Sequence, residues 1–284
     1  MKCSNIGYTD YSAGDLNFVS GCTAISVGCA NCYARAIYER MGRDFSQVQT
    51  HPEKLARLAK ARFPAPDSVG ARWNKRGNHS RPLAFVCDTG DLFHDDVPSG
   101  FIYEALMVMA SRTDVDWLVL TKRAERMANL ASWWFPGGET AGVRGATWPA
   151  NVWPGVTVEN QEAVGRIRFL SQVPAAVRWL SVEPCLAKIE MREYLGFCLD
   201  CDAYIDEHRE DGPFYHDDEP RIHWVVCGAE SGPNRRPFDP AWALSLYRQC
   251  QEAGIPFFFK QGSALRPGQD ALLPGVGEVK EWPR

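Results

Sequence analysis

The sequence lacks several features that would assign it to a class of protein at once. It contains no run of about 18 uncharged apolar residues, so no membrane span is expected. Its first residues, MKCSNIGYTDYSAGDLNF, lack the apolar core that is typical of a secretory signal. No internal repeat or low-complexity tract is visible. These absences favour a soluble, cytoplasmic globular protein with no membrane partner.

An overall excess of basic charge is also missing, because the formal net charge is −4. The distribution of charge is nevertheless uneven. Segment 54–81 contains eight Lys and Arg residues against one Asp, whereas segment 200–219 contains nine Asp and Glu residues against one Arg. Phe63 and Trp73 lie among the cations of 54–81, a mixture that is typical of phosphate contacts and base stacking. This segment predicts a DNA or nucleotide substrate, although a solvated amphipathic helix over 54–62 would show the same pattern.

Short apolar runs alternate with helical stretches along most of the chain. The runs are nearly continuous in apolar residues, as expected for parallel strands covered on both faces. Strands are expected at 16–22, 83–88, 116–122, 152–159, 177–183, 223–230 and 256–261. Helices are expected at 30–41, 99–112, 123–133, 160–172 and 239–253. The alternation predicts an α/β fold, a partial (β/α) barrel, in a single domain over 1–284.

Two segments interrupt the alternation, the long basic segment 43–81 and an acidic insertion at 190–222. Nearly every expected strand ends in a polar residue. These residues are Asp88, Lys122, Glu159, Glu183, Glu230 and Gln261. Because the carboxyl ends of barrel strands carry the active site, the pattern predicts a polar mouth into which side chains converge.

Three of the ten cysteines lie close together, at Cys22, Cys29 and Cys32. In a compartment that keeps thiols reduced, such a group indicates metal binding or catalysis rather than a disulfide. The thiolates suit a zinc site completed by Cys3 or a histidine, or an iron–sulfur cluster, and plain loop cysteines are the third interpretation. Their position at the end of the first expected strand favours a four-iron cluster, in which three thiolates leave one iron open for a cofactor.

Seven motifs follow one another from about residue 17 to residue 262: GCTAISVGCANCYA, DTGDLFHDDVP, LVLTKRAERM, VWPGVTVENQ, RWLSVEPCL, CGAESGPNRRPFDPAW and QCQEAGIPFFFKQ. Through these motifs the chain resembles a phage and prophage family of radical-S-adenosylmethionine-like proteins. The Cys-x6-Cys-x2-Cys spacing differs from the x3 and x2 gaps of most of the radical S-adenosylmethionine superfamily. The resemblance implies a partial barrel of the radical S-adenosylmethionine type, with a [4Fe-4S] cluster on Cys22, Cys29 and Cys32 and S-adenosyl-L-methionine on the fourth iron.

The same resemblance implies residues around the cofactor. Tyr33 follows the last cysteine and would pack on the adenine. Gly228 and Glu230 match a strand–glycine–glutamate element near the adenine. In place of the superfamily motif that holds the methionyl amino group, the chain has CDTGD, with the candidates Asp88, Thr89 and Asp91.

Other candidates come from their places at the strand ends. Lys122, Arg123 and Lys260 would bind a carboxylate or phosphate, with plain surface cations as the alternative. The same cavity would be lined by Thr157, Glu159, Asn160, Ser181 and Glu183. Cys87 could donate a hydrogen atom to a product radical. The catalytic candidates are therefore Cys87, Lys122, Glu183 and Lys260.

The acidic insertion contains a second close pair, Cys198 and Cys201. Two thiolates with His208 and His216 would satisfy tetrahedral zinc, and a redox pair or plain loop cysteines are the alternatives.

These observations predict a radical S-adenosylmethionine enzyme that takes an electron from an external donor and generates a 5′-deoxyadenosyl radical for hydrogen abstraction. A phage setting favours a hypermodified thymine or another DNA base as the substrate, and the host cytoplasm as the location. Two alternatives stay open: the same chemistry on a small metabolite or peptide, and a non-enzymatic zinc- or cluster-bearing binding protein. The sequence indicates neither the reaction outcome nor the oligomeric state.

Overall fold

The computed structural model describes residues 2–4, 6–12, 14–63, 81–135, 147–198, 203–204 and 222–283. The part of the basic segment at 64–80 lies outside the described residues, as do Cys201, His208 and His216 of the predicted zinc site. The zinc site therefore stays a prediction, and so does the assignment of the whole chain to one domain.

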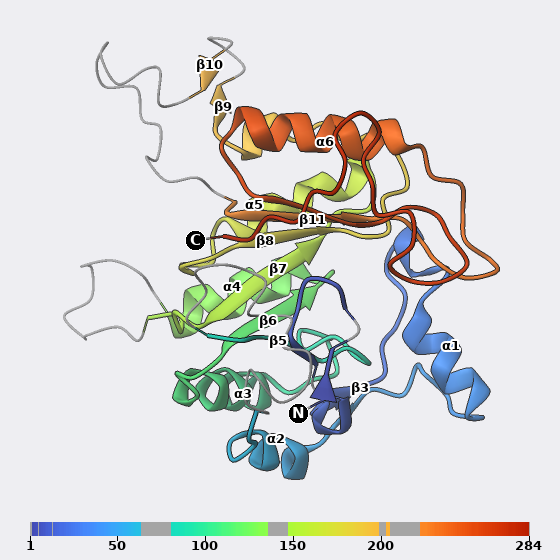
Figure 1. Cartoon of the computed structure of the whole chain (residues 1–284). Helices are drawn as coiled ribbons and strands as arrows, with labels where there is room; N and C mark the ends of the chain where they lie inside the picture. Colours follow the sequence, from blue (N-terminus) through green and yellow to red (C-terminus); the bar gives the residue numbers. More distant parts are fainter. Residues whose placement is uncertain are drawn as a thin grey trace, which may run out of the picture.

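An open eight-stranded sheet forms the centre of the molecule (Figure 1). Its strands follow one another across the sheet in the order of the chain, and all neighbours from β2 to β12 pair in parallel. In that order the strands are β1 Lys2–Cys3, β2 Tyr11–Ser12, β5 Leu83–Val86, β6 Asp116–Thr121, β7 Val152–Thr157, β8 Trp179–Val182, β11 Trp224–Gly228 and β12 Phe257–Gln261. Only β1 is antiparallel to its neighbour. The predicted partial (β/α) barrel is confirmed.

Helices join successive strands and cover one face of this sheet (Figure 1). They are α3 Ser99–Ser111, α4 Ala124–Trp134, α5 Arg166–Leu170 and α6 Pro240–Glu252. The predicted start of α6 is confirmed, because Pro240 occupies the first turn and the Asp239 carboxylate accepts a hydrogen bond from the Ala241 amide at 2.9 Å. The helix expected over 160–172 is divided into a 3-10 turn, Gln161–Gly165, and α5.

Outside this framework lie two further helices and two small antiparallel sheets. The helices are α1 Tyr33–Arg40 and α2 Pro52–Leu58, and short 3-10 turns occur at Gly14–Leu16, Val27–Cys29 and Arg192–Tyr194. The small sheets pair β3 Val19–Ser20 with β4 Gln49–Thr50, and β9 Phe197–Cys198 with β10 Ala203–Tyr204. No helix of the described residues is long and apolar enough to cross a membrane.

The strand expected over 16–22 is wrong as a member of the main sheet. Only β3 is extended there, and it pairs with β4 instead of the barrel strands. Gly21 has a φ of +84°, which bends the chain away from a strand, so the contact with the main sheet is a single bridge between Gly21 and Gly90. The edge of the parallel sheet is taken by β2, which the sequence did not predict.

Side chains alternate between the two faces of the strands, and the sheet therefore separates two hydrophobic clusters. The larger cluster lies between the sheet and the helices and includes Val119 and Leu180. The smaller cluster lies on the inner face, where Trp153, Trp179 and Trp224 pack with Tyr8 and Phe258. This aromatic floor fills the inner face toward the amino ends of the strands.

The polar residues predicted to form the mouth continue the inner-face positions of the same strands. Counting in steps of two from the aromatic floor gives Thr157 on β7, Ser181 on β8, Gly228 on β11 and Lys260 on β12, and then Glu159, Glu183 and Glu230 just beyond the first three strands. The carboxyl half of the inner face is therefore polar above an aromatic floor.

Gly155 is required by the packing of this floor. A Cβ atom at Gly155 would lie 2.3 Å from Cε2 of Trp179, whose indole N–H is held by the Trp153 carbonyl at 3.1 Å. We expect Gly155→Ala to lower the free energy of unfolding by about 3 kcal/mol, because the ring cannot move aside without losing that bond. Urea unfolding measures the change. Gly165→Ala is the control, since no atom lies within 4 Å of its added Cβ, and equal stability of the two variants would contradict this packing.

Candidate functional site

The segment from Cys22 to Cys32, here called the cysteine loop, begins against the carboxyl end of β5. The Gly21 amide donates to the Thr89 carbonyl at 3.0 Å, and the Cys22 amide donates to the Phe45 carbonyl at 2.8 Å. A Cβ atom at Gly21 would lie 2.2 Å from the Gln47 carbonyl oxygen, so only glycine permits this approach. In Figure 1, α1, which follows the loop, lies on the side toward which the arrow of β7 points.

The three cysteines of the loop are free and only partly buried. Cys29 ends the 3-10 turn Val27–Cys29, and Cys32 is the residue before α1. Burial and the charge of Asp91 raise the pKa of Cys22, although a hydrogen bond from Arg123 opposes them. Burial also acts to raise the pKa of Cys29, but backbone hydrogen bonds and the charge of Lys122 outweigh it, and the net shift is downward. The environments of two thiols in the loop thus differ.

The three free thiols of the loop are the kind of donor set that an iron–sulfur cluster takes. In the part of the chain that the structure describes, no three His, Cys, Asp or Glu side chains are gathered closely enough to hold one metal ion. A four-iron cube instead takes each thiolate on a different iron and needs three free thiols near compensating cations. The loop provides those thiols, and Lys122 and Arg123 provide positive charge beside Cys29 and Cys22.

Arg123 holds the first part of the loop. Its Nη2 donates to the carbonyl and hydroxyl oxygens of Thr23 at 3.2 and 2.9 Å, and its Nη1 lies 3.5 Å from the Cys22 sulfur. Nη1 also donates to the Asp91 carboxylate at 3.3 Å. The same carboxylate accepts from the Thr121 hydroxyl at 2.7 Å and from the Phe93 amide at 2.9 Å. Asp91 therefore joins the ends of β5 and β6 and orients Arg123 toward the loop.

Arg236 holds the second part of the loop. Its guanidinium forms an ion pair with the Glu230 carboxylate beyond β11, and its Nη1 donates to the Val27 carbonyl at 2.9 Å. Glu230 also accepts from the Asn31 amide at 2.9 Å. Burial acts to raise the pKa of Glu230, but the Arg236 hydrogen bonds outweigh it and lower the pKa. Glu230 therefore hydrogen-bonds the cysteine loop directly, through the side-chain amide of Asn31.

Glu159 lies against the middle of the cysteine loop, next to Gly28. Its side chain is 0% exposed, and a Cβ atom at Gly28 would lie 2.9 Å from its Oε1. Nη1 of Arg166 donates to Oε2 of Glu159 at 2.6 Å. Burial acts to raise the pKa of Glu159, but Ser26, Arg166 and Lys122 together lower it. The close contact explains why a glycine precedes Cys29.

Glu183 and Lys260 form an ion pair on the inner face, where the carboxylate directly follows β8 and the ammonium comes from β12. The ammonium lies 5.8 Å from the centre of the Tyr8 ring. Burial and the charge of Glu183 raise the pKa of Tyr8 well above its ordinary value. A Cβ atom at Gly228 would lie 3.4 Å from Cβ of Lys260 and 3.5 Å from Cδ of Glu183, so Gly228 is next to both residues. The structure therefore brings together three of the predicted residues next to the aromatic floor.

Asp88 lies at the β5 end of the mouth. It accepts a hydrogen bond from the Asn17 side-chain amide, and its own amide donates back to Asn17 at 3.1 Å. The hydroxyl of Tyr33 donates to the Asp88 carbonyl, although 58% of the Tyr33 residue is exposed. Burial raises the pKa of the Asp88 carboxyl. Tyr33 thus connects the start of α1 to the end of β5.

Three further predicted residues are buried. Cys87 has a φ of +61° and belongs to the larger hydrophobic cluster, and burial together with the charges of Asp88 and Asp91 raises its pKa well above the ordinary value. Thr157 and Ser181 are paired across β7 and β8, and both are buried. The Cys87 thiol is thus buried close to Val19, Asp88 and Asp91.

Sequence reasoning did not single out Arg166, Arg236, Asn31 or Thr23. Arg236 was present in the quoted motif CGAESGPNRRPFDPAW, which gave a signal but no role. Arg166 had no signal, because an arginine in a helical stretch normally faces solvent. Asn31 and Thr23 act through contacts with residues more than 90 positions away.

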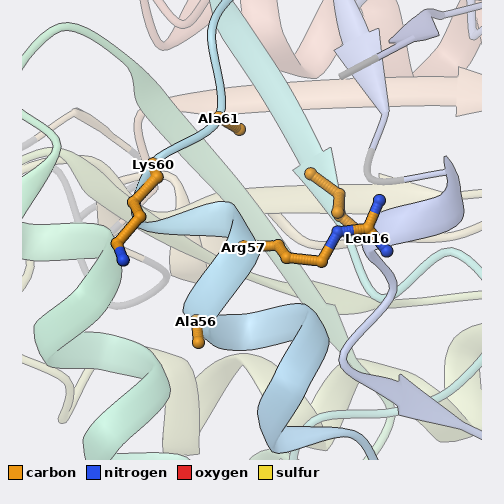
Figure 2. Close-up of a pocket in the computed structure, with 5 residues that line it drawn as sticks. All are labelled: Leu16, Ala56, Arg57, Lys60 and Ala61. Carbon is orange, nitrogen blue, oxygen red and sulfur yellow. The ribbon is translucent and has the colours of Figure 1, made fainter.

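A separate open hollow of about 430 Å³ lies between α2 and the 3-10 turn Gly14–Leu16. Figure 2 shows Arg57 reaching from α2 toward Leu16, whereas Lys60 points to the other side. Ala56 and Ala61 complete the lining. None of the predicted site residues lines this hollow, but its cations belong to the basic segment 54–81.

Residues 3–271 match the family described as Protein of unknown function (DUF5131), and the chain belongs to this family. No curated protein matches the chain. Among solved structures, the chain is similar to one of spore photoproduct lyase complexed with dinucleoside spore photoproduct, with 10% identity and a TM-score of 0.49 over 93% of this chain and 78% of that chain. A second, mutant structure of that enzyme has 10% identity and a TM-score of 0.48 over the same shares of both chains. A third, with bound AdoMet and dinucleoside spore photoproduct, has 8% identity and a TM-score of 0.44 over 89% of this chain and 64% of that chain. At these scores the likenesses assign no function.

Replacing Glu159 by Gln tests how much the ion pair between Glu159 and Arg166 stabilises the protein. We expect the free energy of unfolding near neutral pH to fall by about 2 kcal/mol, because Arg166 loses its charged acceptor. The folded pKa of Glu159 lies below the ordinary value of 4.5, so its contribution is fully present above that value and is lost as the pH falls through the folded pKa. The difference between parent and variant therefore narrows below about pH 4.5 in urea unfolding series.

The exposed Glu162, in the 3-10 turn that follows Glu159, provides the control, as Glu162→Gln. A loss of stability in Glu159→Gln that stayed constant down to about pH 3 would contradict this account.

Proposed function

We propose that the protein is a radical S-adenosylmethionine enzyme, with a [4Fe-4S] cluster on Cys22, Cys29 and Cys32. The observation that carries the proposal is a loop with three free thiols that is held over the carboxyl ends of a parallel partial barrel by two arginines. When bound, the cluster would supply one electron that cleaves S-adenosylmethionine to a carbon radical. An external electron donor is required.

The residues of the mouth have complementary roles in this proposal. Glu183 and Lys260 present opposite charges next to each other, which suits the amino and carboxylate groups of a methionyl moiety. Gly228 leaves room above the pair. Tyr33 and Asp88 lie beside the last cysteine, where an adenine ring would pack on the exposed phenol. Thr89, Thr157 and Ser181 stay predicted contacts of the same cofactor.

Asp91, Glu159 and Glu230 have a different part. Each carboxylate is already paired with an arginine that contacts the loop or its supports, so each orients the loop instead of binding the cofactor directly. Lys122 lies near both Cys29 and Glu159 and would balance the negative charge of thiolate ligands. Cys87 is 6% exposed, so donation of a hydrogen atom by its thiol stays a prediction that the proposal does not need.

Cleavage of S-adenosylmethionine tests the enzyme class. After anaerobic reconstitution and reduction with dithionite, we expect about four irons per chain and formation of 5′-deoxyadenosine. Replacing Cys22, Cys29 and Cys32 together by Ala should reduce both to background, since no other thiol of the loop can replace them. Cys250→Ala is the matched control, because that thiol is buried on α6 away from the loop. Parent-like 5′-deoxyadenosine formation by the triple variant would refute the proposal.

A base in DNA, such as a hypermodified thymine of a phage genome, is the proposed substrate. Arg57 is exposed on α2 and Lys60 is exposed just after the end of this helix, and α2 is joined to residues 18–20, which lead into the cysteine loop. The His51 amide before α2 donates to the Phe18 carbonyl at 2.8 Å, and the His51 ring bonds the Ser20 hydroxyl at 2.8 Å. A DNA strand whose phosphates contact α2 would therefore pass beside residues 18–20, which lead to the cysteine loop.

The double charge reversal Arg57→Glu with Lys60→Glu tests this surface. We expect weaker binding to single- and double-stranded DNA, and a slope of log affinity against log salt that is smaller by about 2, because two phosphate contacts are lost. Fluorescence anisotropy at several salt concentrations measures both. Arg248→Glu on α6 is the control, since it is exposed on a helix far from α2 (Figure 1). An unchanged slope in the double variant would exclude this surface, and turnover without nucleic acid would favour a metabolite or peptide substrate.

A further inference from the structure

Two arginines hold the cysteine loop in similar ways, yet only one of them reaches a sulfur atom. Arg123 and Arg236 each pair with a carboxylate at a strand end and each donate to a backbone carbonyl of the loop. Arg123 alone directs an N–H group at a thiol, with Nη1 at 3.5 Å from the sulfur of Cys22. The two arginines therefore form a natural comparison within one loop.

The surroundings of Arg123 fix the direction of this donor. Its side chain is 6% exposed, compared with 30% for that of Arg236. Nη2 is engaged by Thr23, and Nε faces the carboxylate of Asp95 at 3.5 Å. Thr23 is fixed in turn by the buried His94, whose Nε2 lies 2.8 Å from the Thr23 hydroxyl oxygen. With these contacts in place, Nη1 points between Asp91 and the Cys22 sulfur.

A charged guanidinium donor is better suited to a negatively charged sulfur than to a neutral thiol. A neutral thiol is a weak acceptor, whereas sulfur that ligates metal carries negative charge and accepts charge-assisted hydrogen bonds. Hydrogen bonds to the ligating sulfurs are among the factors that set the reduction potential of an iron–sulfur centre, because they stabilise its more negative, reduced form.

We propose that Arg123 is a positioning residue that hydrogen-bonds the Cys22 sulfur in the metal-loaded protein and thereby makes the centre easier to reduce. Arg236 positions the loop without this effect, because its donors end on Glu230 and on the Val27 carbonyl. The proposal rests on the proposed function only in taking Cys22 as a metal ligand.

The test compares Arg123→Lys with Arg236→Lys, which both keep the positive charge and lose the planar fork of donors. In the metal-free proteins, hydrogen exchange is measured by mass spectrometry. We expect faster exchange of the amides at 22–25 in Arg123→Lys, and of those at 27–31 in Arg236→Lys. In the reconstituted proteins, one-electron reduction by dithionite is titrated by electron paramagnetic resonance.

We expect the ratio of reduced to oxidised centre at a fixed potential to fall about tenfold in Arg123→Lys, which is a shift of about 59 mV for one electron. The ratio in Arg236→Lys should stay within about twofold of the parent, a shift of under about 20 mV. Equal shifts in the two variants, or no shift in Arg123→Lys, would overturn the proposed effect on reduction. Unchanged exchange at 22–25 would overturn the positioning role.

The outcomes also separate this proposal from the proposed function. If the parent forms no iron–sulfur centre, the proposed function fails and so does the effect on reduction, while the exchange result still decides whether Arg123 positions the loop. If Arg123→Lys does not fold, the double change Asp91→Asn with Arg123→Gln removes both buried charges together, and the same two measurements apply to it.

Discussion

Paired charge at the carboxyl ends of the parallel strands determines where the cysteine loop lies. Asp91 and Glu159 are buried there, and a buried carboxylate is tolerated only when cations and hydrogen bonds compensate the loss of water. Arg123 and Arg166 provide that compensation. A guanidinium donates hydrogen bonds in one plane and in fixed directions. When some of its N–H groups bind the buried carboxylate, the directions of its other N–H groups, which face the loop, are therefore also fixed. The position of the loop thus follows from the need to neutralise buried charge beneath it.

The two faces of the sheet differ in what covers them. Helices cover the outer face, and the inner face is filled toward the amino ends of its strands by three tryptophans packed with Tyr8 and Phe258. Since these rings occupy the lower part of the inner face, the polar residues that continue the same strands are confined to the carboxyl ends. The ion pair of Glu183 with Lys260 lies at this boundary, where one side is apolar and the other is open to the loop. An ionic ligand that binds this ion pair would lie next to the aromatic rings of the floor.

Prediction from the sequence succeeded where the local pattern was long and consistent. The apolar runs of β6 and β7, and the helix expected from residue 239, appear in the structure as expected. The strand at 16–22 failed, because Gly21 takes a left-handed conformation and Asn17 bonds Asp88 instead of continuing a ladder. The edge strand β2 was missed because two residues are too few to give a periodic signal.

The sequence by itself determined the order of strands and helices and the presence of three thiols on one short segment, since both depend on residues that are near in the chain. It could not determine which cations meet which thiols and carboxylates. Arg123 and Cys22 are 101 positions apart, and Arg236 and Val27 are 209 positions apart. Such contacts depend on the order of strands across the sheet and on the approach of Gly21 and Gly28 to their neighbours. Only the tertiary structure decided them, because hydrogen bonds and ion pairs act over a few ångströms of space, whatever the separation along the chain.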